Sequence, residues 1–122
     1  MPDRDADAAV APLPLGYRDL LHAFVAAVRP DERIRAAWLS GSVARGVADA
    51  GSDLDLIVTV RDGAFEGFAD TWREWLDTWA DTILARELPG MPGSFSATTR
   101  DGLRVDVVSE SVSTSRETLH RI

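Results

Sequence analysis

The chain has 122 residues, which is enough for one domain with a modest core, and 45% of them are hydrophobic, as in globular proteins. The net charge is −7 and no lysine occurs, so the basic surface of a general nucleic-acid-binding protein is not expected. The absence of cysteine excludes disulfides, thiolate zinc sites and a cysteine nucleophile, and two histidines are too few for a histidine-rich metal centre. The oxygen ligands that remain suit Mg²⁺ or Mn²⁺.

The first half of the chain predicts a tail, a helix and two strands. Residues 1–14 are acidic and rich in Ala and Pro, so we expect a disordered tail rather than a signal peptide. Apolar residues recur at helical spacing from Tyr17, and Pro30 marks the end of that helix. A strand, a short helix and a second, strongly apolar strand are then expected at 34–39, 42–48 and 54–60.

The second half predicts an amphipathic helix and a hairpin. Large apolar side chains share one face from Ala64 to about Ala80. The stretch 83–88 fits either a continuation of that helix or another strand. Two strands at 95–99 and 103–109 flank a turn with glycine and form the expected hairpin.

The predicted fold is α/β (α+β), a small mixed β-sheet with helices packed on one face. We assign residues 15–112 to this domain. Thr114 and Glu117 fit a capping box, so 113–122 is expected to begin a C-terminal helix, possibly of a truncated second domain or one completed by a partner. No apolar stretch reaches membrane-spanning length, and a cytoplasmic protein with no membrane partner is expected.

Two aspartates are placed one residue apart at the start of the strongest strand. Side chains at i and i+2 share a face, so Asp53 and Asp55 are expected to point together while Leu54 points into the core. Two carboxylates this close repel each other unless a cation lies between them. Mg²⁺ held by one or two carboxylates and substrate phosphates is the usual arrangement.

A phosphate-binding turn is predicted just upstream. Gly41 and Ser42 end one strand and open the short helix, so backbone N–H groups and a helix N-terminus face outward together. An ordinary turn with Ser42 as helix N-cap is compatible with this reading. The turn lacks the Gly-Lys-Ser/Thr ending of a Walker loop.

Gly-Ser, a spacer and then Asp-x-Asp resembles the signature of the nucleotidyltransferase fold, the superfamily of DNA polymerase beta, over about 34–109. The resemblance implies a third carboxylate on a later strand, which Asp106 matches. It implies metal-dependent transfer of a nucleoside monophosphate from an NTP, expected to be ATP, to a hydroxyl. Asp53 and Asp55 would hold two Mg²⁺ ions, with Mn²⁺ as an alternative, and Asp106 would hold one of them and accept the proton. The alternative is three solvated strand acids, although carboxylates are disfavoured in strands.

Two arginines are candidates for binding the triphosphate. Arg45 follows the phosphate turn by one helical turn, and Arg104 shares the face of Asp106. A solvated charge for Arg45, and a structural ion pair with one of the aspartates for Arg104, are the alternatives.

Three functions remain open. The first is transfer to a small hydroxyl-bearing acceptor, resembling aminoglycoside nucleotidyltransferases, whose cationic acceptors would suit an acidic cleft. The second resembles minimal nucleotidyltransferase antitoxins, which modify a helical toxin partner. The third is a non-catalytic nucleotide-binding module. The acidic composition argues against a polymerase.

Overall fold

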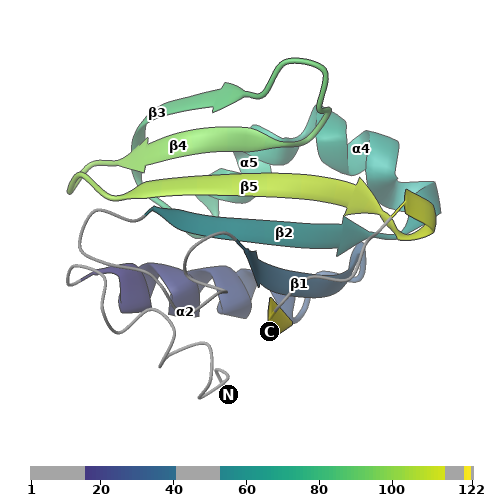
Figure 1. Ribbon diagram of the computed structural model, residues 1–122, viewed down its shortest axis with the longest axis horizontal. Coiled ribbons are helices and arrows are strands. Elements are labelled where there is room, and N and C mark those ends of the chain that lie inside the picture. The colour runs from purple at the N-terminus through teal and green to yellow at the C-terminus, as the bar shows by residue number, and fades with distance from the viewer. Residues whose placement is uncertain (1–15, 41–52, 115–119, 122) are drawn as a thin grey trace.

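A mixed β-sheet forms the centre of the molecule in this computed structural model, which describes residues 16–40, 53–114 and 120–121. The described strands lie in the order β3-β4-β5-β2-β1-β6 (Figure 1). Of the pairings among them, β2 with β5 is parallel and the others are antiparallel. The strands are β1 (Ile34–Ser40), β2 (Leu54–Val60), β3 (Thr82–Glu87), β4 (Phe95–Thr99), β5 (Arg104–Ser111) and β6 (His120–Arg121). The predicted mixed sheet is confirmed.

Among the described residues, the helices cover one face of this sheet and leave the other open, as predicted (Figure 1). Helix α2 (Tyr17–Val28) has the predicted bounds and buries its apolar stripe against the sheet. Residues at alternate positions of β2, β5 and β4 are buried beneath the helices, because successive side chains of a strand point to opposite faces. The intervening positions therefore form the open face.

The predicted helix 64–80 is interrupted, which corrects the expectation of one continuous element. A 3₁₀ turn η1 (Asp62–Ala64) leads into α4 (Phe65–Asp70), and α5 (Trp72–Asp77) follows after Thr71. The Thr71 hydroxyl donates a hydrogen bond of 2.8 Å to the carbonyl of Gly67, a contact that bends helices.

Aromatic packing accompanies this interruption. Trp72 stacks on Phe95 of β4 with 4.6 Å between ring centroids. Trp75 and Trp79 meet Phe24 of α2 edge to face, at 6.0 and 5.2 Å, and Trp75 also contacts Phe95 and Phe68 of α4. One aromatic face thus joins the two helical segments to both the sheet and α2, and tertiary packing overrides the sequence periodicity.

The ambiguous stretch 83–88 is the edge strand β3 rather than a helix. Edge strands present unpaired backbone groups. Here the guanidinium of Arg73 donates a 2.9 Å hydrogen bond to the carbonyl of Ala85, so a side chain from α5 covers part of this edge. Ile83 and Leu84 remain about 60% exposed beside it.

The hairpin of β4 and β5 is confirmed, and β5 extends to Ser111. In its turn, Gly102 adopts φ 89°, a conformation that favours glycine. The Thr99 hydroxyl donates to Asp101 and accepts the backbone N–H of Leu103, which ties the turn together.

The predicted C-terminal helix is wrong where the structure describes it. Residues Val112–Thr114 form a 3₁₀ turn, η2, and His120–Arg121 form β6, which pairs with β1 at Trp38 and Leu39. Two turns of isolated helix gain little, whereas a strand that pairs with β1 satisfies backbone groups on both. The predicted tail 1–14 and short helix 42–48 lie outside the described residues. In the described part of the chain, no helix is long and apolar enough to cross a membrane.

Candidate functional site

The two aspartates of the Asp-x-Asp motif lie on the open face of the sheet. Leu54 and Leu56 are buried under the helices, while Asp53 and Asp55 are half-buried on the opposite side. The predicted alternation of this strand is therefore confirmed.

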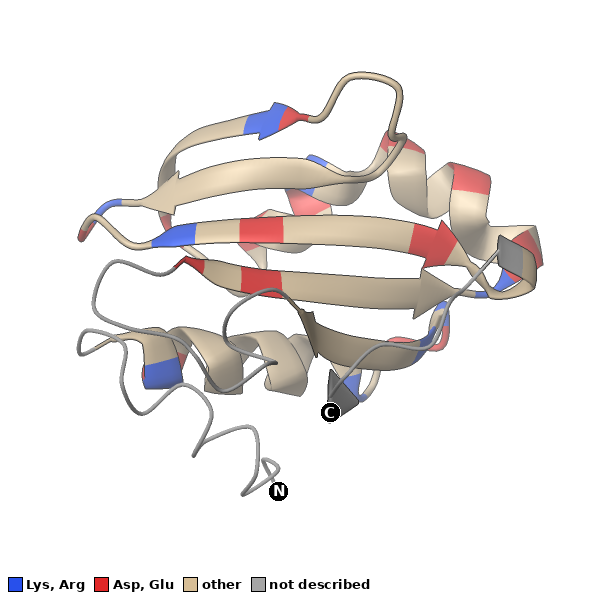
Figure 2. Cartoon of the chain, viewed as in Figure 1, with Lys and Arg blue, Asp and Glu red and all other residues tan. Residues whose placement is uncertain are grey.

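The third aspartate lies beside the second. Strands β2 and β5 run parallel, and their register makes Asp55 and Asp106 direct neighbours, with backbones about 4.8 Å apart. The flanking Val105 and Val107 are fully buried, so Asp106 points to the open face. Figure 2 shows acidic residues side by side on these two strands.

Arg104 pairs with the first aspartate. Its Nε lies 3.9 Å from Oδ2 of Asp53, and the two side chains are 61% and 32% exposed. Its backbone N–H donates a 2.9 Å hydrogen bond to the hydroxyl of the buried Tyr17, which fixes the start of β5 against α2. The structural ion pair that we considered for Arg104 is thus present. An exposed pair at this distance contributes little stability.

The acidic pair belongs to a row of side chains that crosses five strands. Direct cross-strand partners link Ser40 to Asp55, Asp55 to Asp106, Asp106 to Ser96, and Ser96 to Arg86. Cross-strand partners share a face, so the whole row lies on the open side of the sheet. Its position is set by sheet register rather than by loops.

Ser96 and Arg86 were not predicted as site residues. The hairpin turn at 100–102 fixes the register that pairs Ser96 with Asp106, so Ser96 was within reach of sequence reasoning. Arg86 was not, because its segment could not be assigned as a strand from periodicity alone.

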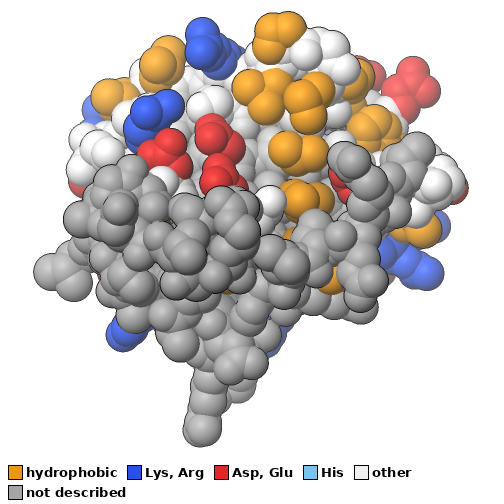
Figure 3. Space-filling model, in the orientation of Figure 1, with side chains coloured by type: hydrophobic (Ala, Val, Ile, Leu, Met, Phe, Trp, Pro, Cys, Tyr) orange, Lys and Arg blue, Asp and Glu red, His pale blue; other side chains and the backbone are white. Residues whose placement is uncertain are grey.

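A hollow of about 370 Å³ follows this row. It combines two acids, two arginines, two serines and apolar walls: Ser40, Asp55, Leu56, Ile57, Arg86, Leu88, Ser96, Arg104, Asp106 and Val108. In Figure 3, acidic side chains gather between basic side chains and a stretch of hydrophobic ones on this face. A polar, charged centre beside an apolar wall is typical of a small-ligand site.

The donor set fits a hard divalent cation. Asp55 and Asp106 supply carboxylate oxygens from adjacent backbones, which is the chemistry that Mg²⁺ and Mn²⁺ prefer. Within 16–40, 53–114 and 120–121, no three His, Cys, Asp or Glu side chains are grouped closely enough to form a metal site on their own. The structure thus offers two adjacent carboxylates, with Asp53 directed to Arg104.

Three of the predicted phosphate ligands, Gly41, Ser42 and Arg45, lie outside the described residues. Gly41 directly follows Ser40, the last residue of β1 and the end of the row. The predicted phosphate-binding residues therefore follow the last residue of this row directly in the sequence.

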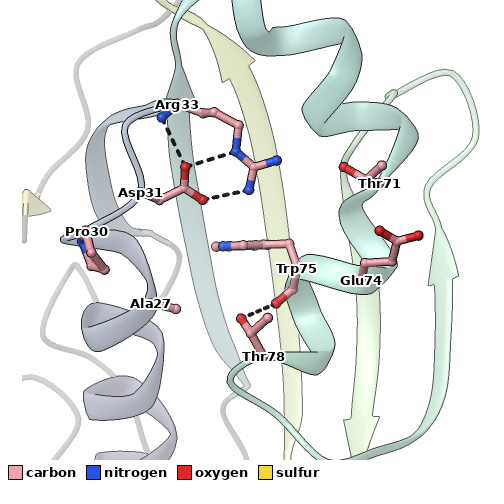
Figure 4. Close-up of a pocket in the computed structure, with 8 residues that line it drawn as sticks. All are labelled: Ala27, Pro30, Asp31, Arg33, Thr71, Glu74, Trp75 and Thr78. Atoms are coloured by element: carbon pink, nitrogen blue, oxygen red, sulfur yellow. Dashed lines mark hydrogen bonds and ion pairs between the residues drawn. The ribbon is translucent and has the colours of Figure 1, made fainter.

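A second hollow, of about 420 Å³, lies on the helical side and contains none of the predicted site residues. Figure 4 shows Asp31 and Arg33 directed at each other there, with two hydrogen bonds of 2.9 and 2.7 Å between their side chains. These bonds lower the pKa of the Asp31 carboxyl and raise the pKa of Arg33. The charges neutralise each other, so the arrangement is that of a structural ion pair.

Comparison with known proteins agrees with this fold. The family described as "Nucleotidyltransferase domain" matches residues 23–89, which include β1, β2 and the Asp-x-Asp motif. No curated protein matches. CdnC from E. coli MS115-1, solved in complex with HORMA-deltaN, is similar in fold, with 22% identity and a TM-score of 0.50 over 94% of this chain. The chain spans 38% of the length of CdnC. The chain belongs to the nucleotidyltransferase domain family.

Proposed function

We propose that the chain transfers a nucleoside monophosphate, AMP from ATP, to a hydroxyl of a small molecule and releases pyrophosphate. The observation that supports this most strongly is the direct pairing of Asp55 with Asp106 on the open face, beside the β1 end from which the Gly41-Ser42 turn continues. Family membership supplies the reaction class, and the oxygen donors suit a Mg²⁺-dependent reaction.

Each residue has a defined task in this proposal. Asp55 and Asp106, together with Asp53, would hold Mg²⁺ or Mn²⁺. When bound, the cation would stabilise the negative charge on the phosphate oxygens. Asp106 is the acid nearest the acceptor side of the row and accepts the proton of the attacking hydroxyl. A bond forms between the acceptor oxygen and the α-phosphorus as the bond from that phosphorus to the pyrophosphate oxygen breaks.

Arg104 and the phosphate turn would bind the polyphosphate. Arg104 releases Asp53 and donates hydrogen bonds to phosphate oxygens. Gly41 and Ser42 offer backbone and hydroxyl donors. Arg45 adds a second guanidinium. The leaving pyrophosphate then departs on the β1 side, away from the acceptor.

The test is calorimetric titration of ATP with Mg²⁺, combined with measurement of pyrophosphate release. We expect Asp55→Asn to weaken ATP binding by at least tenfold, because it removes one carboxylate of the cation site. We expect Asp106→Asn to reduce transfer by at least 100-fold, because it removes the proton acceptor as well.

The matched control is Asp70→Asn, an exposed acid on α4 at the other side of the sheet. It changes net charge by the same amount and is expected to change neither readout. Equal binding in wild type and Asp55→Asn contradicts the proposed site. Metal-dependent binding without any transfer, tried on small and protein acceptors, supports the nucleotide-binding module instead.

A further inference from the structure

The end of the site row at β3 carries a cation that no described acid neutralises. Arg86 lies directly opposite Ser96 and lines the same hollow as Asp55 and Asp106. Its side chain is exposed, and among the described residues it has no hydrogen bond or ion pair. The acid next in sequence is engaged elsewhere, since Oε2 of Glu87 accepts the backbone N–H of Gly93 at 3.1 Å.

The two arginines of the hollow are therefore not equivalent. Arg104 is shared with Asp53, whereas the guanidinium of Arg86 keeps its full capacity for an added anion. Figure 2 shows basic positions at the start of β5 and near the end of β3.

Arg86 also lies at the opposite end of the row from Ser40, the residue that precedes Gly41 in the sequence. The row runs from Ser40, which precedes Gly41, through the acidic pair and Ser96 to Arg86. In the proposed function, which this step assumes, the nucleotide lies at the β1 end. A group that attacks the α-phosphorus from the far side therefore approaches over β4 and β3, so Arg86 faces the acceptor.

We propose that β3 and β4 form an acceptor subsite for a hydroxyl compound that carries a phosphate or carboxylate group. A guanidinium offers a planar pair of N–H donors that matches either anion. The Ser96 hydroxyl lies next to it and adds a donor, while Leu88 and Val108 provide apolar contact for the carbon skeleton. A cationic acceptor, expected from the overall acidity, would meet like charge here.

The test is an NMR titration of backbone amides with small probes, in the absence of nucleotide and metal. Glycerol 3-phosphate and glycerate are the anionic probes, and glycerol and ethanolamine are the neutral and cationic ones. We expect the anions to shift the amides of β3 and β4 around Arg86 and Ser96, and the other two to leave them unchanged. A larger effect of glycerol 3-phosphate than of glycerate identifies a phosphate subsite, and the reverse identifies a carboxylate subsite.

Variants assign the effect to the guanidinium. Arg86→Gln is expected to weaken anion binding about tenfold, since a charge-assisted hydrogen bond is removed, and Arg86→Lys to weaken it less. Arg18→Gln removes an exposed arginine from α2 and is the matched control, with unchanged affinity expected. The amide spectrum of each variant reports its folding.

Any of three results would overturn the subsite. The first is unchanged anion affinity in Arg86→Gln, and the second is the absence of anion-dependent shifts at β3 and β4. The third is tighter binding of ethanolamine there than of the anions. Failure of the proposed function has a different signature, because ATP–Mg²⁺ binding is measured separately and is tested by Asp55→Asn rather than by Arg86→Gln. The subsite can therefore fail while nucleotide binding persists, and anion binding can persist when nucleotide binding fails.

Discussion

Single residues show how charge is divided between stability and function in this chain. Asp31 and Arg33 form a short, doubly hydrogen-bonded pair on the helical side, whereas Asp53 and Arg104 approach only to 3.9 Å on the open face. Tight pairs are held in one geometry, and loose pairs can rearrange around a ligand. The open face therefore retains charges that a substrate can use.

The Asp31 pair predicts a pH dependence of stability. Because Arg33 lowers the pKa of Asp31 below its ordinary value of 3.8, the pair contributes stability above about pH 4, and this contribution is lost as the pH falls through the lowered pKa. We expect Asp31→Asn to lower the free energy of unfolding by about 0.5–1 kcal/mol at pH 7, a value reduced for the partial exposure of Arg33. The difference from wild type shrinks below pH 3.8.

Urea denaturation at pH 7 and pH 3 measures this difference. Asp81→Asn is the control, because its partner Arg100 and Asp81 itself are both largely exposed, at 68% and 73%. The control is expected to match wild type at both pH values. A difference between wild type and Asp31→Asn that grows toward pH 3 contradicts the assignment.

At the level of elements, the sequence predicts those whose pattern repeats or whose turn chemistry is local. Helix α2, strand β2 and the β4–β5 hairpin follow from helical spacing, alternation and a glycine turn, and all are confirmed. The interruption at Thr71 was not predictable from periodicity, because the contacts of Trp72 with β4 depend on the folded sheet.

The candidate site was likewise predictable from the sequence only where a local pattern or the family resemblance identified its residues. Asp53 and Asp55 could be placed on one face from alternation alone, and the family resemblance added Asp106. The pairing of Asp55 with Asp106 required the parallel register of β2 and β5, which no local pattern encodes. Arg86 required the assignment of β3 as a strand, which periodicity left undecided.

The aromatic contact that joins α5 to the sheet carries a stability prediction. Trp72 is 7% exposed and stacks on Phe95, so Trp72→Ala leaves a large cavity between helix and sheet. We expect a loss of about 3–5 kcal/mol in the free energy of unfolding. Denaturant unfolding measures it, with Asp77→Ala on the exposed face of α5 as the control and a change below about 0.5 kcal/mol expected there. Similar losses in both variants would contradict the assignment of this stability to the packing of Trp72 on Phe95.

For the whole molecule, the negative net charge predicts weak binding of DNA and RNA. The net charge is −7, every cation is an arginine or histidine, and acids occupy the centre of the open face. On so acidic a chain, phosphate backbones gain little by displacing counterions. We expect no binding of a 20-nucleotide DNA or RNA at about 50 mM salt by fluorescence anisotropy, where basic domains bind strongly. Salt-sensitive binding at micromolar protein would contradict this expectation and return a polymerase-type acceptor to consideration.

The parallel pairing of β2 with β5 also governs when the site can exist during folding. Asp55 and Asp106 are brought together by a contact between distant parts of the chain, across all of α4, α5, β3 and β4. Long-range parallel contacts form slowly, because the chain loses loop entropy before it gains their energy. The two carboxylates consequently come together only when β2 pairs with β5, so a partly folded chain lacks this pair. A cation or nucleotide that binds the pair then stabilises the native state selectively, and ligand binding reports on the completion of folding.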